Sequence, residues 1–204
     1  MPVETIFRLH LIFGYVAWLL CFGSYIWPRL RSADGLEAHR AIATLHSFRF
    51  FGLVFLLPGV TGPHLPYEFA LFDAYGDFAT GLLAILALLT VRIRPVFWTF
   101  VVAFNVVGFG DIMIDYYHAI AAGVPAIAGE FGSTYAIVVI YVPLLVITHV
   151  TAFYLLLRPQ ARAANALAAS AQPPLRPDIR FAHDMDLDDG IVPTANVTNS
   201  QGTA

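Results

Sequence analysis

Residues 104–118 read FNVVGFGDIMIDYYH and lie inside an apolar segment that is long enough to cross a bilayer. The stretch nevertheless contains an amide, two carboxylates and an imidazole, which are Asn105, Asp111, Asp115 and His118. Ionisable side chains are rare in membrane-spanning segments because burial in hydrocarbon is costly, and those that occur usually pair with one another or act on a ligand. We therefore expect this stretch to belong to a polar centre inside a helical membrane protein.

The whole chain has the composition of a membrane protein. It contains 204 residues, of which 58% are hydrophobic and only 12% are charged, whereas soluble domains contain about 25% charged residues. The mean hydropathy of +0.71 and the long uncharged runs indicate several membrane spans. A single cysteine, Cys21, excludes a disulfide within the chain. The sequence contains no basic patch of the kind that binds nucleic acids.

Five apolar segments predict five transmembrane helices, since each is about 20 residues long or slightly longer. Pro28 should end the first helix, whereas Pro143 should kink the fifth helix and Pro159 should stop it. The proline- and glycine-rich residues 57–66 should break the second helix before the outer surface. The predicted fold class is therefore all-α, a polytopic bundle in residues 1–158 with spans at residues 5–27, 42–62, 69–91, 95–117 and 134–157.

The distribution of arginine predicts the orientation in the membrane, because positive charges concentrate in cytoplasmic loops. Nine of the eleven arginines fall in the first loop, the third loop and the C-terminal tail. The N-terminus should therefore lie outside and the C-terminus in the cytoplasm. Residues 159–204 should form a largely disordered cytoplasmic tail, because much of this segment is polar and acidic. Arginine without lysine suggests a GC-rich bacterial genome, and hence the inner (plasma) membrane.

The depth of each polar residue follows from its distance to the ends of its predicted helix, at about 1.5 Å per residue. Asn105 lies near the midplane, Arg49 enters from the cytoplasmic side and Asp77 enters from the outer side. The axial gap between Arg49 and Asp77 is about 8 Å, which an extended arginine nearly spans. We therefore expect an Arg49–Asp77 pair with Asn105 beside it. An outer layer is predicted to contain Asp73, Asp111, Asp115 and His118.

Two pairs of aspartates have members four residues apart, which places both carboxylates of a pair on one face of a helix. The pairs are Asp73 with Asp77 and Asp111 with Asp115. Two such faces supply the oxygen ligands that a divalent cation such as Mg²⁺ prefers. The alternative is that Asp73 and Asp115 are solvated helix-end residues, since a charge near the interface costs little.

Histidines at equal depth on different helices are the arrangement that binds haem b through two imidazoles. His46 and His149 both lie in the cytoplasmic half of their predicted helices. Because the chain has no C-x-x-C-H motif for covalent haem attachment, haem is a less favoured cofactor than a divalent cation.

The predicted polar centre leaves three functions open. The first is an enzyme or binding protein with an outward-facing intramembrane site for a lipidic or small-molecule ligand, surrounded by membrane lipids. The second is an ion- or proton-coupled carrier, although the chain lacks the internal repeat of many carriers. The third is a non-catalytic subunit or assembly factor that contacts partner membrane subunits. In the first case Asp111 and Asn105 should face Asp77 and Arg49, with His118 or His64 available for proton transfer.

Overall fold

The computed structural model describes residues 1–158, and their regular secondary structure is entirely helical. The predicted all-α fold is therefore confirmed for this part of the chain, whereas the predicted tail, residues 159–204, lies outside the described residues. The α-helices are α1 (Val3–Cys21), α2 (Trp27–Ser32), α3 (Gly35–His46), α4 (Tyr67–Leu89), α5 (Arg94–Ala121) and α6 (Val142–Leu157). Between them lie two π-helical turns, η1 (Phe22–Ile26) and η4 (Ile137–Tyr141), and two 3₁₀ segments, η2 (Ser47–Leu56) and η3 (Val124–Thr134).

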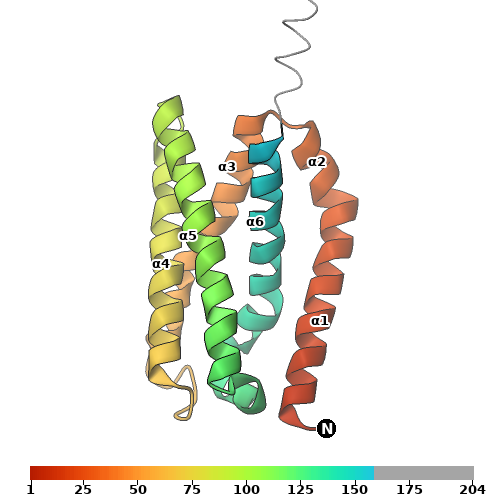
Figure 1. The fold of residues 1–204 in the computed structure, drawn as a ribbon, viewed down its shortest axis with the longest axis vertical. Helices are drawn as coiled ribbons and strands as arrows, with labels where there is room; N and C mark the ends of the chain where they lie inside the picture. The colour runs from red at the N-terminus through yellow and green to blue at the C-terminus, as the bar shows by residue number, and fades with distance from the viewer. Residues whose placement is uncertain (159–204) are drawn as a thin grey trace, which may run out of the picture. The chain divides into compact units, whose positions relative to one another are not determined.

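Four helical segments are long and apolar enough to cross a membrane. They are Val3–Ser32, Tyr67–Leu89, Arg94–Ala121 and Ile137–Leu157, and they correspond to four of the five predicted spans. Figure 1 shows α1, α4, α5 and α6 running alongside one another. Helix α6 contacts α1, α3 and α5, while α4 contacts α3, η2 and α5. The segment α3 therefore packs against both α4 and α6.

The prediction that Pro28 ends the first helix is wrong. The chain passes through the π-helical turn η1 and continues as α2 to Ser32. Proline normally breaks an α-helix because it lacks an N–H and its ring collides with an earlier carbonyl group. Pro28 lies in the first turn of α2, where that N–H is not needed, and the wider π turn precedes it. Pro143 repeats this arrangement after η4, so the predicted kink is a π-helical turn.

The second predicted span is not one continuous α-helix. Helix α3 ends at His46, the 3₁₀ segment η2 follows, and residues 57–66 form turns as predicted. A 3₁₀ helix has three residues per turn, so side chains three apart lie on one face. In η2 this face consists of Arg49, Gly52 and Phe55, which are its buried residues.

Small residues let η2 lie directly against α4. A Cβ atom added at Gly81 would lie 2.7 Å from the backbone nitrogen of Phe50, and one added at Gly52 would overlap the side chain of Asp77. Such close backbone approach is typical of helix contacts in membrane proteins. The packing brings the buried face of η2 to the polar residues of α4.

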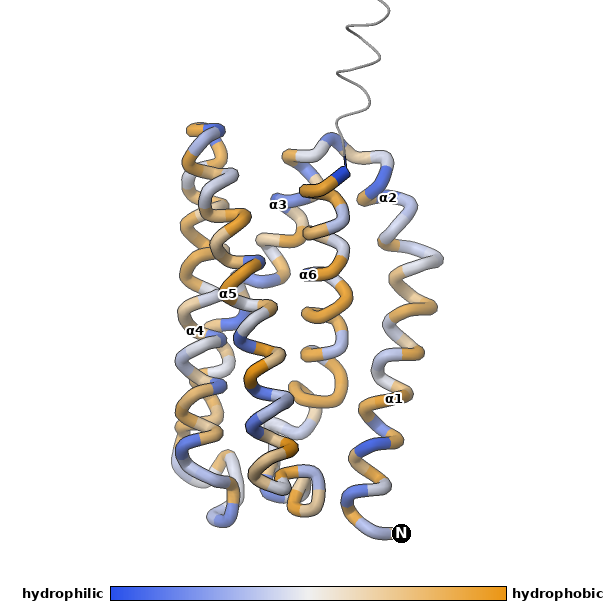
Figure 2. The backbone as a smooth tube through the Cα atoms, viewed as in Figure 1, coloured by the Kyte–Doolittle hydropathy of each residue, from blue (hydrophilic) through white to orange (hydrophobic). Residues whose placement is uncertain are grey.

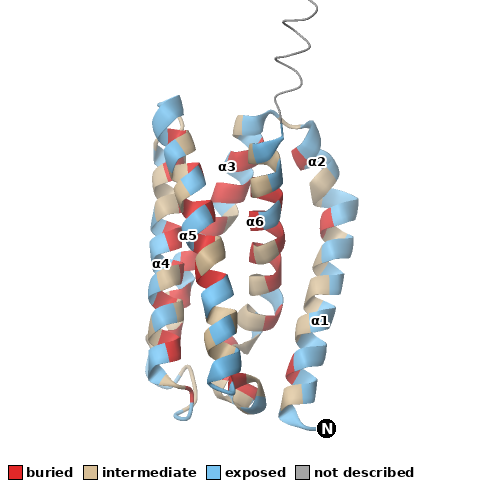
Figure 3. Cartoon of the chain, in the orientation of Figure 1, coloured by how far each residue is buried: buried red, intermediate tan, exposed pale blue. Residues whose placement is uncertain are grey.

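The buried apolar side chains form two clusters with a polar layer between them. One cluster contains Ile42 and Phe97, and the other contains Phe55 and Phe131. Figure 2 shows hydrophilic residues midway along α5, as well as nearer the helix ends. Figure 3 shows that the buried residues of α4, α5 and α6 lie on their packed faces, whereas α1 is mostly exposed. The core therefore encloses a polar centre.

Candidate functional site

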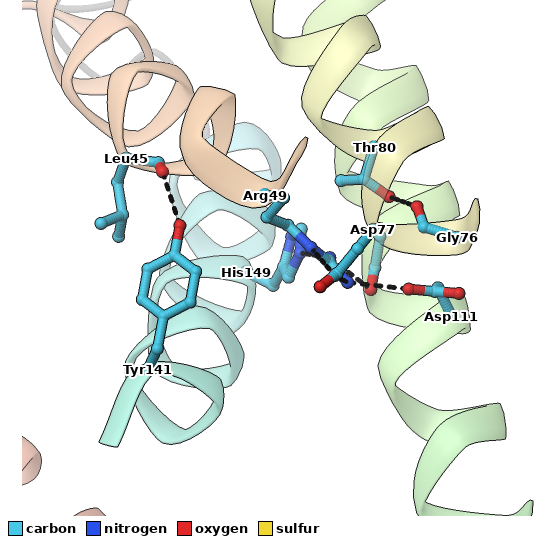
Figure 4. A network of polar contacts seen from close by, with 9 residues as sticks. Leu45, Arg49, Gly76, Asp77, Thr80, Asp111, Tyr141 and His149 are labelled. Carbon is cyan, nitrogen blue, oxygen red and sulfur yellow. Dashed lines mark hydrogen bonds and ion pairs between the residues drawn. The ribbon is translucent and has the colours of Figure 1, made fainter. Parts of the chain in front are cut away.

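Arg49 lies at the middle of this polar centre, with a relative exposure of only 1%. Its Nε donates to Asp77 Oδ1 at 2.6 Å, and its Nη2 forms ion pairs with Asp77 and with Asp111 Oδ2, the latter at 2.7 Å. Its Nη1 donates to the carbonyl oxygen of Gly108 at 3.0 Å. Figure 4 shows the guanidinium between these carboxylates and the ring of His149. The predicted Arg49–Asp77 pair is confirmed, and Asp111 joins it.

Four segments supply the centre, and two glycines leave space for it. Arg49 comes from η2, Asp77 from α4, Asp111 from α5 and His149 from α6. A Cβ atom added at Gly108 would lie 2.7 Å from Arg49 Nη1 and 2.8 Å from His149 Nε2. One added at Gly76 would overlap the carboxylate of Asp111. The guanidinium and its partners therefore fill the space that a side chain at Gly108 or Gly76 would need.

Two histidines extend the centre beyond Arg49. His149 Nδ1 lies 3.0 Å from Asn105 Oδ1, and His149 Nε2 lies 3.4 Å from Arg49 Nη1. Arginine only donates, so we assign Nε2 as the acceptor and place the proton of His149 on Nδ1. His46 Nε2 lies 3.0 Å from the hydroxyl of Thr148. Asn105 therefore orients His149 instead of contacting Arg49 itself.

The geometry of His46 and His149 does not fit the predicted haem site. Their ring centroids are only 4.0 Å apart, with an angle of 42° between the ring planes. An iron between two imidazoles needs a nitrogen of each ring about 2 Å away on opposite sides, which requires more widely spaced rings. Three of the four ring nitrogens also have hydrogen-bond partners in the centre. Both histidines therefore serve as hydrogen-bonding side chains.

Asp73 and Asp115 each bury one carboxyl oxygen, so neither is a fully solvated helix-end residue. Asp73 Oδ2 and Asp115 Oδ1 meet no N–H or hydroxyl donor within residues 1–158, and the two carboxyl groups hydrogen-bond to each other. The same residues contain no group of three or more His, Cys, Asp or Glu side chains that would hold a metal ion. Asp77 and Asp111 face Arg49 instead. The hypothesis of a divalent cation bound by all four aspartates therefore lacks support in this geometry.

A cavity of about 580 Å³ opens onto these acids, and binding cavities for small molecules commonly fall in this size range. Its polar lining consists of Arg49, Asp73, Asp77 and Asp115. Glu4 and Arg8, an exposed ion pair in the first turns of α1, also border it. Its apolar walls come from α1, η2, α4, α5, η3, η4 and the first residue of α6, and include Phe7, Leu11, Phe55, Phe69, Ile112 and Phe131.

The predicted proton-transfer histidines lie away from this centre. The ring of His118 packs edge-on against Phe72, with 5.1 Å between ring centroids, and does not line the cavity. His64 is exposed in the turns after η2, where its backbone N–H donates to Glu130 Oε2 at 2.9 Å. The sequence prediction considered His149 only for haem and missed its contact with Arg49. Its contact with the midplane residue Asn105 is seen only in the structure, so the sequence offered no signal for this role.

No curated protein and no solved structure matches the chain. A family model does match, and it covers every residue of the polar centre. Residues 6–157 match the family described as Domain of unknown function (DUF8737), and the chain belongs to this family.

Proposed function

We propose that this chain is an inner-membrane protein that crosses the bilayer five times. Four crossings are the long apolar helices. The fifth is formed by residues 42–56, which extend about 28 Å because a 3₁₀ helix rises about 2.0 Å per residue, against about 1.5 Å in an α-helix. That length nearly matches a hydrocarbon core of about 30 Å. The arginine distribution supports an external N-terminus.

The outer surface of the bundle supports contact with membrane lipids. Large apolar side chains are exposed along α1, among them Phe13 at 64% and Leu20 at 67%. A continuous apolar surface of this kind is unfavourable in water but is well solvated by lipid tails. We therefore propose membrane lipids as the immediate surroundings of α1.

We further propose that the protein binds a lipidic or small-molecule ligand in the cavity on the outer side of the bundle. The observation that carries this function is the combination of an apolar cavity of about 580 Å³ with a buried Arg49–Asp77 pair at its polar lining, where Arg49 is also paired with Asp111. Apolar walls with a few converging polar groups are typical of ligand sites. Buried ionisable groups within a membrane protein are typical of functional sites.

A proton-relaying carrier is the alternative that the polar centre suggests. Polar groups do continue from Asp111 past Arg49 to His149, whose ring lies against that of His46. A guanidinium, however, has no acceptor site and stays protonated in proteins, so Arg49 interrupts proton transfer along this series. The interruption favours a binding cavity over a relay.

Ligand binding is tested with a variant whose larger side chain fills the cavity. Ala119 lines the cavity, whereas Ala121, the last residue of α5, is exposed and does not line it. Ala119→Trp should block the cavity, and Ala121→Trp adds the same side chain outside it. Native mass spectrometry after incubation with a total small-molecule and lipid extract of the source cells should detect a bound species in wild type and Ala121→Trp.

Ala119→Trp should lose that species while retaining the monodisperse elution and folded yield of the control. Binding that persists unchanged in Ala119→Trp, or no bound species in wild type, would contradict the proposed function.

A further inference from the structure

The polar groups inside the cavity are already bound to one another. Arg49 donates to two carboxylates and to a backbone carbonyl oxygen. The carboxyl groups of Asp73 and Asp115 hydrogen-bond to each other, so at least one of them carries a proton. The hydroxyl of Tyr116 lies 2.8 Å from that of Tyr15. The interior of the cavity therefore requires no hydrogen bond and no charge from a ligand.

The remaining wall of the cavity is apolar and largely aromatic. Phe7, Phe55, Phe69 and Phe131 line it, and all four are buried within the bundle. Contact between apolar surfaces is favourable and has no directional requirement, so these walls suit hydrocarbon better than a polar molecule. The part of a ligand that enters the cavity should therefore be a hydrocarbon chain.

Helices α1 and α5 border the cavity without packing closely against each other. Among the described elements, those in close contact with α1 are η1, η3, η4 and α6. The hydroxyl contact between Tyr15 and Tyr116 joins α1 to α5. Exposed residues of both helices, Arg8 of α1 and Ile120 of α5, lie at the rim of the cavity. This side of the bundle therefore offers a lipid chain a route between the two helices.

The rim also carries donors for an anionic group. Arg8 Nη2 donates to Glu4 Oε1, which is the hydrogen bond that the Arg8 side chain makes within residues 1–158. A guanidinium has five N–H donors, so several remain for an acceptor at the rim. The planar guanidinium group suits phosphate oxygens. Arg8 lies near the start of α1, on the side that we propose faces outward, where lipid phosphates lie.

We propose that the cavity holds one acyl chain of a bilayer phospholipid. This chain lies against the phenylalanine-rich walls, and the phosphate lies at the rim beside Arg8. The second chain stays in the surrounding bilayer, because a volume of about 580 Å³ is in the range that encloses one drug-sized molecule. This inference rests on the proposed ligand-binding function and assigns its ligand class.

Photo-crosslinking from the cavity wall tests the ligand class. The full-length protein, with p-benzoylphenylalanine in place of Phe69, is reconstituted in vesicles of palmitoyl-oleoyl-phosphatidylglycerol. Irradiation joins the benzophenone to a neighbouring C–H bond, and mass spectrometry of the intact protein measures the product. A species heavier by one phospholipid should form. Addition of Ala119→Trp should abolish it, whereas addition of Ala121→Trp should not.

Two other positions for the same photoreactive residue serve as controls. At Phe97, which is buried but does not line the cavity, it should give no lipid adduct. At Phe13, which is 64% exposed on α1, it should give an adduct with or without Ala119→Trp. Phe131 provides the same test if the protein labelled at Phe69 does not fold.

Palmitoyl-oleoyl-glycerol, which has the same chains and no phosphate, tests the role of Arg8. In vesicles that contain equal amounts of the two lipids, the adduct at Phe69 should be mainly phospholipid. Arg8→Gln should reduce this preference by about two- to fivefold, as expected for an exposed charge pair. Arg40→Gln breaks a similar exposed ion pair, with Glu37, outside the cavity and should leave the preference unchanged.

Four results would overturn the acyl-chain proposal: no lipid adduct at Phe69 while Phe13 reacts, an adduct that survives Ala119→Trp, equal capture of the two lipids, or a full preference in Arg8→Gln. The mass-spectrometric experiment on the cell extract separates this failure from that of the proposed function. A species that depends on the cavity, without a phospholipid adduct at Phe69, leaves ligand binding intact and removes only the ligand class.

Discussion

Gly108 is the position where one methyl group should disturb the polar centre most directly. A Cβ atom there would lie 2.5 Å from Thr80 Cγ2, 2.7 Å from Arg49 Nη1 and 2.8 Å from His149 Nε2. Ordinary contacts between such atoms are about 3.5–4.0 Å, so each neighbour would have to move by about 1 Å. The Arg49–Asp111 bond is 2.7 Å long, and a displacement of this size away from Asp111 would break it.

The magnitude of the Gly108→Ala effect follows from three contributions. Forcing a methyl group into a filled site typically costs about 1–3 kcal/mol. A weakened hydrogen bond of the Arg49 cation adds up to about 1.5–3 kcal/mol. Replacing glycine by alanine within a helix stabilises the folded state by only about 0.5–1 kcal/mol, which offsets a small part of these losses. We therefore expect Gly108→Ala to lower the free energy of unfolding by about 2 kcal/mol or more.

Gly110 provides the matched control, because it lies in the same helix, two residues later, and a Cβ atom there meets nothing within 4 Å. Gly110→Ala should be neutral or stabilising by about 0.5–1 kcal/mol. Reversible unfolding by sodium dodecyl sulfate in mixed micelles, followed by circular dichroism, measures both variants against wild type. A Gly108→Ala protein as stable as Gly110→Ala would refute the inferred packing around Arg49.

Two further predictions concern charge. Arg49→Met should lower the free energy of unfolding by about 3–5 kcal/mol, since it leaves two buried carboxylates without their cation. The variant Arg49→Met/Asp77→Asn/Asp111→Asn should recover much of that loss in the same unfolding assay, and a triple variant no more stable than Arg49→Met would count against the charge argument. His39 lies in α3, just before the crossing formed by residues 42–56. Burial lowers the pKa of His39 below its ordinary value of 6.5. The unfolded chain then binds the proton more readily, so stability should fall as the pH drops below about 6.5. His39→Phe should show a smaller fall between pH 7.5 and 5.5 than wild type, and an equal fall would contradict this role.

Hydropathy predicted most of the fold because apolar length is the main requirement for a membrane-spanning helix. Four of the five predicted segments are helices that meet this requirement. The predictions based on proline were less successful, because Pro28 is accommodated by a π-helical turn whose formation depends on packing and not on composition. The 3₁₀ form of η2 could not be predicted either, since its close contact with α4 joins Phe50 to Gly81, thirty-one residues further along the chain.

Depth along each helix predicted much of the polar centre. It indicated that Arg49 and Asp77 would meet, because an unpaired charge at that depth is costly, and they do. It also put His46 and His149 at one level, and their rings are adjacent. Depth alone does not state which side chains face each other around the bundle. For that reason His118, which packs against Phe72, was named as a proton-transfer group for the site, whereas the contact between Arg49 and His149 was not predicted.

The 3₁₀ form of η2 imposes a rule on the variation that this segment can accept. Side chains repeat every three residues in such a helix, so Arg49, Gly52 and Phe55 stay aligned with the interior and do not drift around the axis. Phe48 and Phe51, between the aligned positions, are exposed at 57% and 56%. Evolutionary exchange of apolar side chains should therefore be free at the exposed positions Phe48, Phe50 and Phe51, whereas Val54 and Leu56 pack against the apolar cluster that contains Phe55. Insertion of a single residue would turn all later positions by about 120° and point Phe55 away from the cavity.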